Sequence, residues 1–267
     1  MRKAVLNKAI VTERVLNDEP IEVCGLKLYA LPMSAYIDWN QCKSFLLARQ
    51  AKFPVSCISM SYLEAVFALD VDHLKRTGKL AGWMHAILHA IALSLRMDND
   101  SVDKGNVTIT TDETGEKLRS ILIKRQGMQD AEITPGQFNT LRKVIAWAQG
   151  DDLPDESLND ELLDTENELN ERSSAKLRYD LTDLKASVAL ACGKQIRDVN
   201  KWSILEFEEM RRAVDRSKKH LLCAIASAQG AKWEGGNPYP SWCFDRQDDG
   251  SGALVSASKF DGTAQTS

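Results

Sequence analysis

Residues 80–96 read LAGWMHAILHAIALSLR and contain the longest apolar run of the chain. A helix that is apolar on nearly every side is normally buried in the middle of a domain. The run itself is shorter than the roughly 20 residues that a membrane span needs. It is also interrupted by His85, His89 and Ser94. We therefore predict a central core helix and no membrane-spanning segment.

The next segment, residues 106–124, has the pattern of a β-hairpin. Apolar and polar residues alternate on both sides of the sequence DETGEK, in which Gly115 can adopt a positive φ. A helix is then expected to begin near Thr134, with Pro135 at its first position, and to end near Gly150.

Toward the N-terminus the pattern predicts one strand or hairpin arm followed by two helices. Residues 21–31 alternate roughly and contain β-forming residues, and Pro32 ends this segment. Residues 33–51 carry apolar side chains at a spacing of three and four, which favours a helix. Ser59 or Ser61 can cap a second helix, whose apolar stripe consists of Tyr62, Leu63, Val66, Phe67 and Leu69.

Composition excludes several classes of protein. The 267 residues carry a formal net charge of −4, which gives no overall attraction to nucleic acid or to anionic lipid. The N-terminus has neither the continuous apolar core nor the cleavage site of a secretory signal. The six cysteines form no CxxC pair, so we expect buried thiols in a reducing compartment rather than disulfide bonds.

Residues 151–171 divide the chain by charge. They contain ten Asp or Glu and no Lys, Arg or His, whereas residues 1–150 count 19 basic against 16 acidic side chains and residues 172–246 count 14 against 9. Like charges packed this densely repel one another. Three interpretations stay open for this acidic segment, namely a solvated hinge, an exposed acidic helix and a docking strip.

The C-terminal half is expected to be helical. One helix is predicted over residues 176–192, and a second begins after the capping residue Ser203 and runs to Ala228. The fold class is therefore mainly α with a small β element (α+β). Its expected parts are an N-terminal α+β domain (1–150), an acidic linker or exposed helix (151–175), a helical C-terminal domain with an aromatic Gly/Pro loop (176–246) and a disordered tail (247–267).

No motif of the chain indicates catalysis, and we expect no catalytic residue, no cofactor and no metal ion. His85 and His89 are four residues apart, a spacing that can place two ligands on one metal. The sequence between them lacks the glutamate of a zincin helix, so two hydrogen-bonded core histidines are the favoured interpretation.

Residues 211–220 form a basic cluster on the last helix. One interpretation is a phosphate-contacting surface, over which the solvated face of an amphipathic helix is favoured. A third and more economical interpretation is that the acidic segment folds back onto this basic helix through individually weak ion pairs. The candidate partner-binding residues of this cluster are Arg211, Arg212, Lys218 and Lys219.

Four aromatic side chains lie within the Gly/Pro-containing loop that follows this helix. Such a loop can anchor a partner surface or attach itself to its own domain, and these alternatives weigh evenly. The candidates are Trp233, Tyr239, Trp242 and Phe244.

Several short stretches occur in a characteristic order along the chain. Besides the acidic segment, they are CGLKLYALPMSAY (24–36), MSYL (60–63), ITPGQFNTLRKVI (133–145), WSILEF (202–207) and GAKWEGGNPYPSW (230–242). This order resembles that of the tail assembly chaperones and neighbouring tail-module proteins of long-tailed bacteriophages and prophages, chiefly of Gram-positive hosts. The likeness covers most of residues 21–246.

The resemblance implies a non-enzymatic chaperone of the host cytoplasm that coats the tape-measure protein during tail assembly. Tail-tube subunits are a second expected partner, and homo-oligomers are compatible with the role. Methionines could provide adaptable binding surface, although they more often fill cores. The alternatives are a structural virion component, such as a connector or minor tail protein, and a disfavoured nucleic-acid-binding accessory protein.

Overall fold

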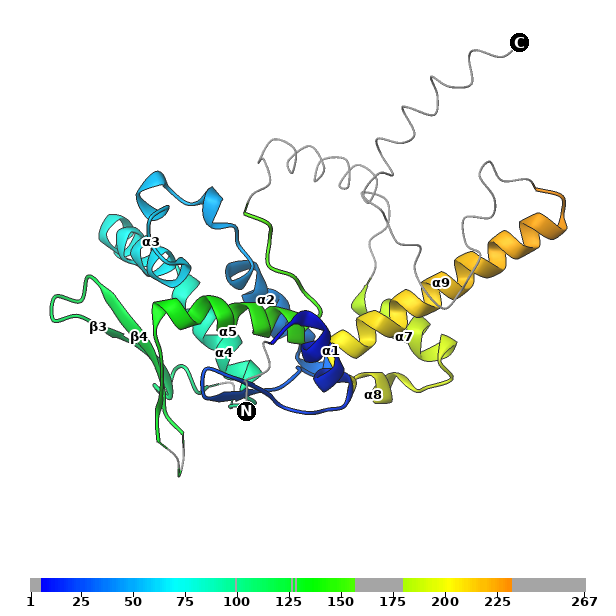
Figure 1. Cartoon of the computed structure of the whole chain (residues 1–267), viewed down its shortest axis with the longest axis horizontal. Helices are drawn as coiled ribbons and strands as arrows, with labels where there is room; N and C mark the ends of the chain where they lie inside the picture. The colour runs from blue at the N-terminus through cyan, green and yellow to red at the C-terminus, as the bar shows by residue number, and fades with distance from the viewer. Residues whose placement is uncertain (1–5, 99, 126, 128, 157–179, 232–267) are drawn as a thin grey trace, which may run out of the picture. The chain divides into compact units, whose positions relative to one another are not determined.

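The computed structural model describes residues 6–98, 100–125, 127, 129–156 and 180–231 (Figure 1). The helices of these residues are α1 (Lys8–Leu16), α2 (Tyr36–Leu46), α3 (Tyr62–Thr77), α4 (Trp83–Ser94), α5 (Pro135–Ala148), α7 (Leu181–Ala191), α8 (Ile196–Val199) and α9 (Ile204–Ala228). Short 3-10 helices are η1 (Met33–Ala35), η2 (Gln50–Lys52) and η3 (Val55–Cys57). The strands are β1 (Ile21–Val23), β2 (Leu26–Leu28), β3 (Val107–Thr111), β4 (Leu118–Ile123) and β5 (Ala131–Ile133).

The fold is mainly α-helical with small antiparallel sheets, which confirms the predicted fold class. Strands β1 and β2 form one sheet, and β3, β4 and β5 form the other in that order. The chain divides into two compact units, Met1–Glu208 and Glu209–Ser267. The first unit thus extends beyond the acidic segment, where the sequence analysis places its domain boundary.

Helix α4 is a central element of the first unit, as its apolar sequence predicts. It packs against α2, α3 and β3, and its buried side chains include Ile87 and Ile91. The expected pair of core histidines is wrong, because His85 is exposed and His89 is only half-buried. The two imidazole rings stack on the open side of the helix, with centroids 6.5 Å apart.

The predicted hairpin is present as β3 and β4, and β5 extends it into a three-stranded sheet. Ile121 of β4 faces Ile109 on one side and Ile133 on the other, which forms an apolar row across the strands. Helix α5 packs against β4 and α4 against β3. The sheet therefore contributes its apolar side chains to the same core as the helices.

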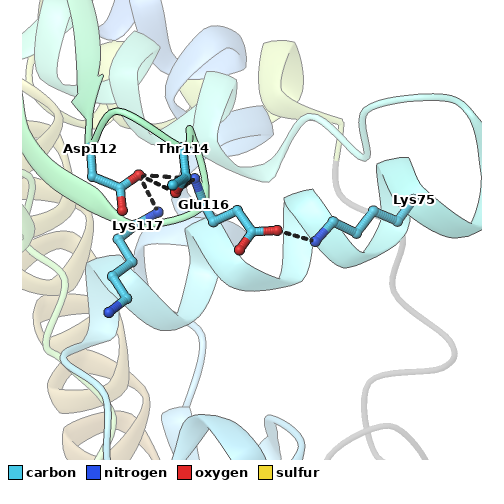
Figure 2. A network of polar contacts seen from close by, with 5 residues as sticks. All are labelled: Lys75, Asp112, Thr114, Glu116 and Lys117. Carbon is cyan, nitrogen blue, oxygen red and sulfur yellow. Dashed lines mark hydrogen bonds and ion pairs between the residues drawn. The ribbon is translucent and has the colours of Figure 1, made fainter.

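Figure 2 shows the polar network at the tip of this hairpin. The Asp112 carboxylate accepts hydrogen bonds from the Thr114 hydroxyl at 2.9 Å and from the backbone N–H groups of Glu116 and Lys117 at 3.1 and 3.2 Å. Gly115 adopts a φ of 73° within the turn, as predicted. Glu116 pairs with Lys75 of α3 at 3.0 Å, so the hairpin tip is attached to a helix.

Most predicted helix boundaries agree with the structure. Ser61 caps α3 in a capping box with Glu64, Pro135 opens α5, and Ser203 accepts a hydrogen bond from the Glu206 N–H at 3.0 Å. The helix predicted over residues 33–51 is shorter, because α2 ends at Leu46 and a separate 3-10 turn follows. Helix α1, strand β5 and helix α8 are not predicted from the sequence.

The segment that leads into α9 completes the core of the first unit. Ser203 pairs with Pro32 in an isolated β-bridge, and the Ile204 N–H donates to the Leu31 carbonyl at 2.8 Å. Phe207 is fully buried in the same core. In the part of the chain that the structure describes, no helix has the length and apolarity to cross a membrane.

Candidate functional site

An apolar groove of about 450 Å³ lies on the first unit, between the end of α2 and helices α3 and α4. Its lining is dominated by aromatic and aliphatic side chains, which is typical of sites that accept an apolar ligand or a helix. These side chains are Phe45, Ala48, Phe53, Pro54, Tyr62, Val66, Leu69 and Trp83, and the rim adds Ser44, Lys52 and Arg76.

One wall of the groove is fixed by Arg142 of α5, a side chain only 5% exposed. Its guanidinium group donates to the carbonyl oxygens of Leu46, the last residue of α2, and of Ala48 just beyond it. Carbonyls at a helix end have no partner within the helix, so this side chain satisfies them. Arg142 thereby determines where α2 ends and where Ala48 faces the groove.

Tyr62 joins this wall to α3. The Arg142 guanidinium carbon lies 3.5 Å from the centroid of the Tyr62 ring, and the Tyr62 hydroxyl donates to the Phe45 carbonyl. Burial raises the pKa of Tyr62 to about 12, while the charge of Arg142 opposes this shift. Burial also lowers the pKa of Arg142. The stacked pair is therefore a desolvated arrangement, in which a cation–π contact is worth more than at the surface.

The opposite wall depends on Asp70 of α3, which is 4% exposed. Its carboxylate accepts hydrogen bonds from the N–H groups of Trp83 at 3.3 Å and Met84 at 2.7 Å. Helix α4 begins after Gly82, which has no side chain that could cap the helix. Asp70 of the neighbouring helix α3 caps it instead. This contact places Trp83 at the edge of the groove.

The rim loop, residues 50–60, contains η2 and η3 and borders the groove through Phe53 and Pro54. The Gln50 side-chain amide donates to the carbonyls of Cys57 at 3.1 Å and Met60 at 2.7 Å, which closes the loop on itself. The loop also exposes Val55 (84%), Ile58 (61%) and Met60 (38%). Exposed apolar side chains beside an apolar groove are typical of a docking surface.

The strap, residues 151–156, begins the acidic segment and lies on the first unit. Asp151 accepts a hydrogen bond from the Trp39 indole N–H at 3.1 Å and pairs with Lys43 at 3.6 Å. Asp152 pairs with Lys8 of α1. The Glu156 carboxylate accepts hydrogen bonds from the N–H groups of Gln50 at 3.0 Å and Ala51 at 3.2 Å.

Three of the first six residues of the acidic segment bond to the first unit. Asp151 bonds to α2, Asp152 to α1 and Glu156 to η2. These contacts hold the strap against the first unit. Residues 157–171 lie outside the described residues.

The four basic candidates lie on α9. Arg212 pairs with Glu209 and Lys219 with Asp215, each at 3.0 Å, so both take part in ion pairs within their own helix. Arg212, Lys218 and Lys219 are exposed, and Arg211 is half-buried. None of the four belongs to the groove. The aromatic candidates Trp233, Tyr239, Trp242 and Phe244 lie outside the described residues.

A second cavity of about 640 Å³ lies between the β1–β2 hairpin, the end of α4 and β4. Both of its arginines have structural roles. Arg96 stacks over Tyr29 at 4.5 Å and pairs with Asp18 at 3.2 Å, while Arg125 donates to the carbonyls of Gly25 and Gln129. These arginines connect neighbouring segments of the chain, and the apolar groove is the stronger candidate for a partner site.

Among the residues that the structure describes, no group of three or more His, Cys, Asp or Glu could hold a metal ion. Cys42, Cys57 and Cys223 are buried free thiols, as predicted, whereas Cys24 and Cys192 are half-buried. Cys243 lies beyond the part that the structure describes. The methionines also differ in burial, since Met33 and Met84 lie in the core and Met60 is exposed on the rim loop.

Sequence reasoning missed the three charged residues that organise the groove. Arg142 and Asp70 occur within the apolar stripes of α5 and α3, at the helical spacing of the buried residues around them. A charge at a core position requires a partner, so each could have been recognised as a site residue. Glu156 offers no such signal, because it is one of ten similar carboxylates in its segment.

Comparisons with protein-family models, with curated proteins and with solved structures find no match to this chain.

Proposed function

We propose that this protein is a non-enzymatic assembly chaperone that binds an apolar helical segment of another polypeptide in the groove. The single observation that carries the proposal is an apolar groove of about 450 Å³ bordered by an exposed apolar loop. An amphipathic helix that enters such a groove buries side chains spaced three and four residues apart. The proposed role requires neither a catalytic residue nor a cofactor.

The resemblance to phage tail assembly chaperones supplies the proposed partner. A tape-measure protein is long, apolar and helical, and it would aggregate before the tail tube surrounds it. We propose that the groove shields such a helix in the host cytoplasm, with tail-tube subunits as a second partner. Reversible binding suits a chaperone that must later be displaced, and a small apolar groove provides modest affinity.

The test is co-expression with a candidate tape-measure protein. Val55→Asp combined with Ile58→Asp places two charges on the exposed rim loop without disturbing buried positions. Leu190→Asp is the matched control, because Leu190 is 84% exposed but belongs to α7. We expect the unchanged chain and the control to keep the partner soluble and to co-purify with it, whereas the double variant loses most of the soluble partner.

Partner solubility that is unchanged by the double variant would contradict binding at the groove. A partner that stays insoluble with every variant, including the unchanged chain, would contradict the chaperone role itself. Mass spectrometry of purified particles adds a second test, since abundant copies in mature virions would favour a structural component instead.

A further inference from the structure

We infer that Glu156 is a positioning residue for the groove, because it anchors the rim loop in the conformation that accepts a partner. The inference rests on the proposed function for the partner and deepens it by naming what organises the site. Glu156 does not line the groove itself. It acts through residues 50–60.

The first step is the contact between Glu156 and the backbone of η2. Its two carboxylate oxygens accept hydrogen bonds from successive N–H groups, those of Gln50 at 3.0 Å and Ala51 at 3.2 Å. N–H groups at the start of a helical turn have no partner within the turn, and a carboxylate is a strong acceptor for them. The Glu156 carbonyl also accepts a hydrogen bond from Arg49 at 3.5 Å.

The second step runs through the Gln50 side chain. The residue whose backbone is bound by Glu156 donates its own side-chain amide to the carbonyls of Cys57 and Met60. One residue therefore connects the strap to the far end of the rim loop. Between these two points lie Phe53 and Pro54, which line the groove, and the exposed Val55 and Ile58.

The third step is the attachment of the strap to the core at its other end. Asp151 accepts a hydrogen bond from the indole of Trp39, a fully buried residue of α2, and pairs with Lys43 of the same helix. Five residues later, Glu156 reaches the rim loop. The strap thus spans from a helix of the core to a loop, residues 50–60, in which Cys57 alone is buried.

The structure indicates that the loss of Glu156 should weaken partner binding rather than strengthen it. The groove is formed in the structure, where the strap is attached, so the attached state is the state that accepts a partner. When only a fraction of the molecules is competent, the apparent dissociation constant rises by the inverse of that fraction. If the loss of Glu156 leaves roughly a tenth of the molecules competent, binding weakens about tenfold.

The first experiment measures hydrogen exchange of the full chain with Glu156→Ala. The matched control is Glu113→Ala, which removes an exposed carboxylate from the hairpin turn far from residues 50–60 in sequence. We expect faster exchange of the amides of the rim loop in Glu156→Ala and unchanged exchange in the control. Equal exchange in the two variants would overturn the inference, and this result does not depend on any partner.

The second experiment measures binding of a fluorescein-labelled amphipathic peptide with leucines on one helical face and alternating lysine and glutamate on the other. We expect about tenfold weaker binding by Glu156→Ala, an intermediate loss for Glu156→Gln, which keeps one acceptor oxygen, and no change for Glu113→Ala. Equal affinities would overturn the positioning role. Faster exchange with no peptide binding by the unchanged chain would support the anchoring by Glu156 and contradict the proposed function.

Discussion

Tyr62 combines an aromatic ring that lines the groove with a hydroxyl group that bonds to the backbone of α2. Its side chain is only 1% exposed, and the hydroxyl donates to the Phe45 carbonyl. Burial raises the pKa of this hydroxyl from 10.0 to about 12, since a phenolate would lose its hydration in the core. The wall of the groove is therefore sensitive to ionisation of a single residue.

We expect the protein to lose stability at alkaline pH because of Tyr62. A folded-state pKa above the unfolded value contributes stability that is complete below pH 10.0 and is lost as the pH rises through about 12. The loss amounts to roughly 2–3 kcal/mol for a shift of this size. Urea unfolding at a series of pH values measures it.

Tyr62→Phe is the control for this measurement. The variant should lower the free energy of unfolding by about 1 kcal/mol at neutral pH, because the Phe45 carbonyl loses its hydrogen-bond donor. Its stability should then fall less steeply above pH 10 than that of the unchanged chain. An alkaline loss of the same size in both proteins would assign the effect to other groups.

The residues of the site differ in how far the sequence reveals them. Phe45, Tyr62 and Val66 could be predicted as apolar positions of two helices, but their place in the lining of one groove depends on how α2 and α3 pack. Arg142 and Asp70 carry a recognisable signal, namely a charge in an apolar stripe. The basic residues of α9 carry a conspicuous charge pattern that does not contribute to the groove.

At the scale of elements, the β3–β4 hairpin depends on a turn organised by one carboxylate. Asp112 accepts hydrogen bonds from the N–H groups of Lys117 and Glu116 and from the Thr114 hydroxyl (Figure 2). The bond from the Lys117 N–H contributes most to lowering the pKa of Asp112 below its ordinary value of 3.8, and the Thr114 bond follows. These bonds favour the charged form, so the turn is most stable when Asp112 is ionised.

We expect the Asp112 carboxyl group to titrate below pH 3.8 in the folded protein. A depressed folded-state pKa contributes stability above the unfolded pKa, and that contribution is lost as the pH falls below 3.8 through the folded value. Carboxyl carbon chemical shifts followed by NMR give the value directly. Titration of Asp112 at 3.8 or above would contradict the role of these hydrogen bonds.

Elements with local signals could be predicted, and elements that depend on distant contacts could not. The caps Ser61 and Ser203 and the turn at Gly115 act within a few residues, so the sequence contains them completely. Strand β5 has only three residues and forms by pairing with β4. Helix α2 ends where Arg142 donates to the Leu46 carbonyl, and these two residues are 96 positions apart in the sequence.

At the scale of the whole molecule, the first unit is assembled from both sides of the acidic segment. Helices α7 and α8 and the first turn of α9 belong to it, and Lys185 of α7 donates to the Met33 carbonyl at 3.1 Å. The change in charge along the sequence contains no information on which elements pack together. Charge sets solvation, whereas the core is determined by apolar contacts.

We expect Phe207→Ala to destabilise the first unit by about 3–4 kcal/mol, because Phe207 is completely buried at the beginning of α9. Leu222→Ala in the same helix is the control and should change stability by less than about 0.5 kcal/mol, since Leu222 is 66% exposed. Urea unfolding followed by far-UV circular dichroism measures both. Similar losses for the two variants would place Phe207 outside the core.

The residues that line the groove all fall between Ser44 and Trp83, whereas two of the side chains that brace it, Arg142 and Glu156, come from a distant part of the chain. The third bracing side chain, Asp70, lies inside the same interval and does not line the groove. Substitutions confined to partly exposed lining residues such as Phe45, Phe53 and Trp83 can therefore retune which sequence is accepted while the bracing contacts stay constant. A library randomised at those positions alone would give variants with new preferences on an unchanged scaffold.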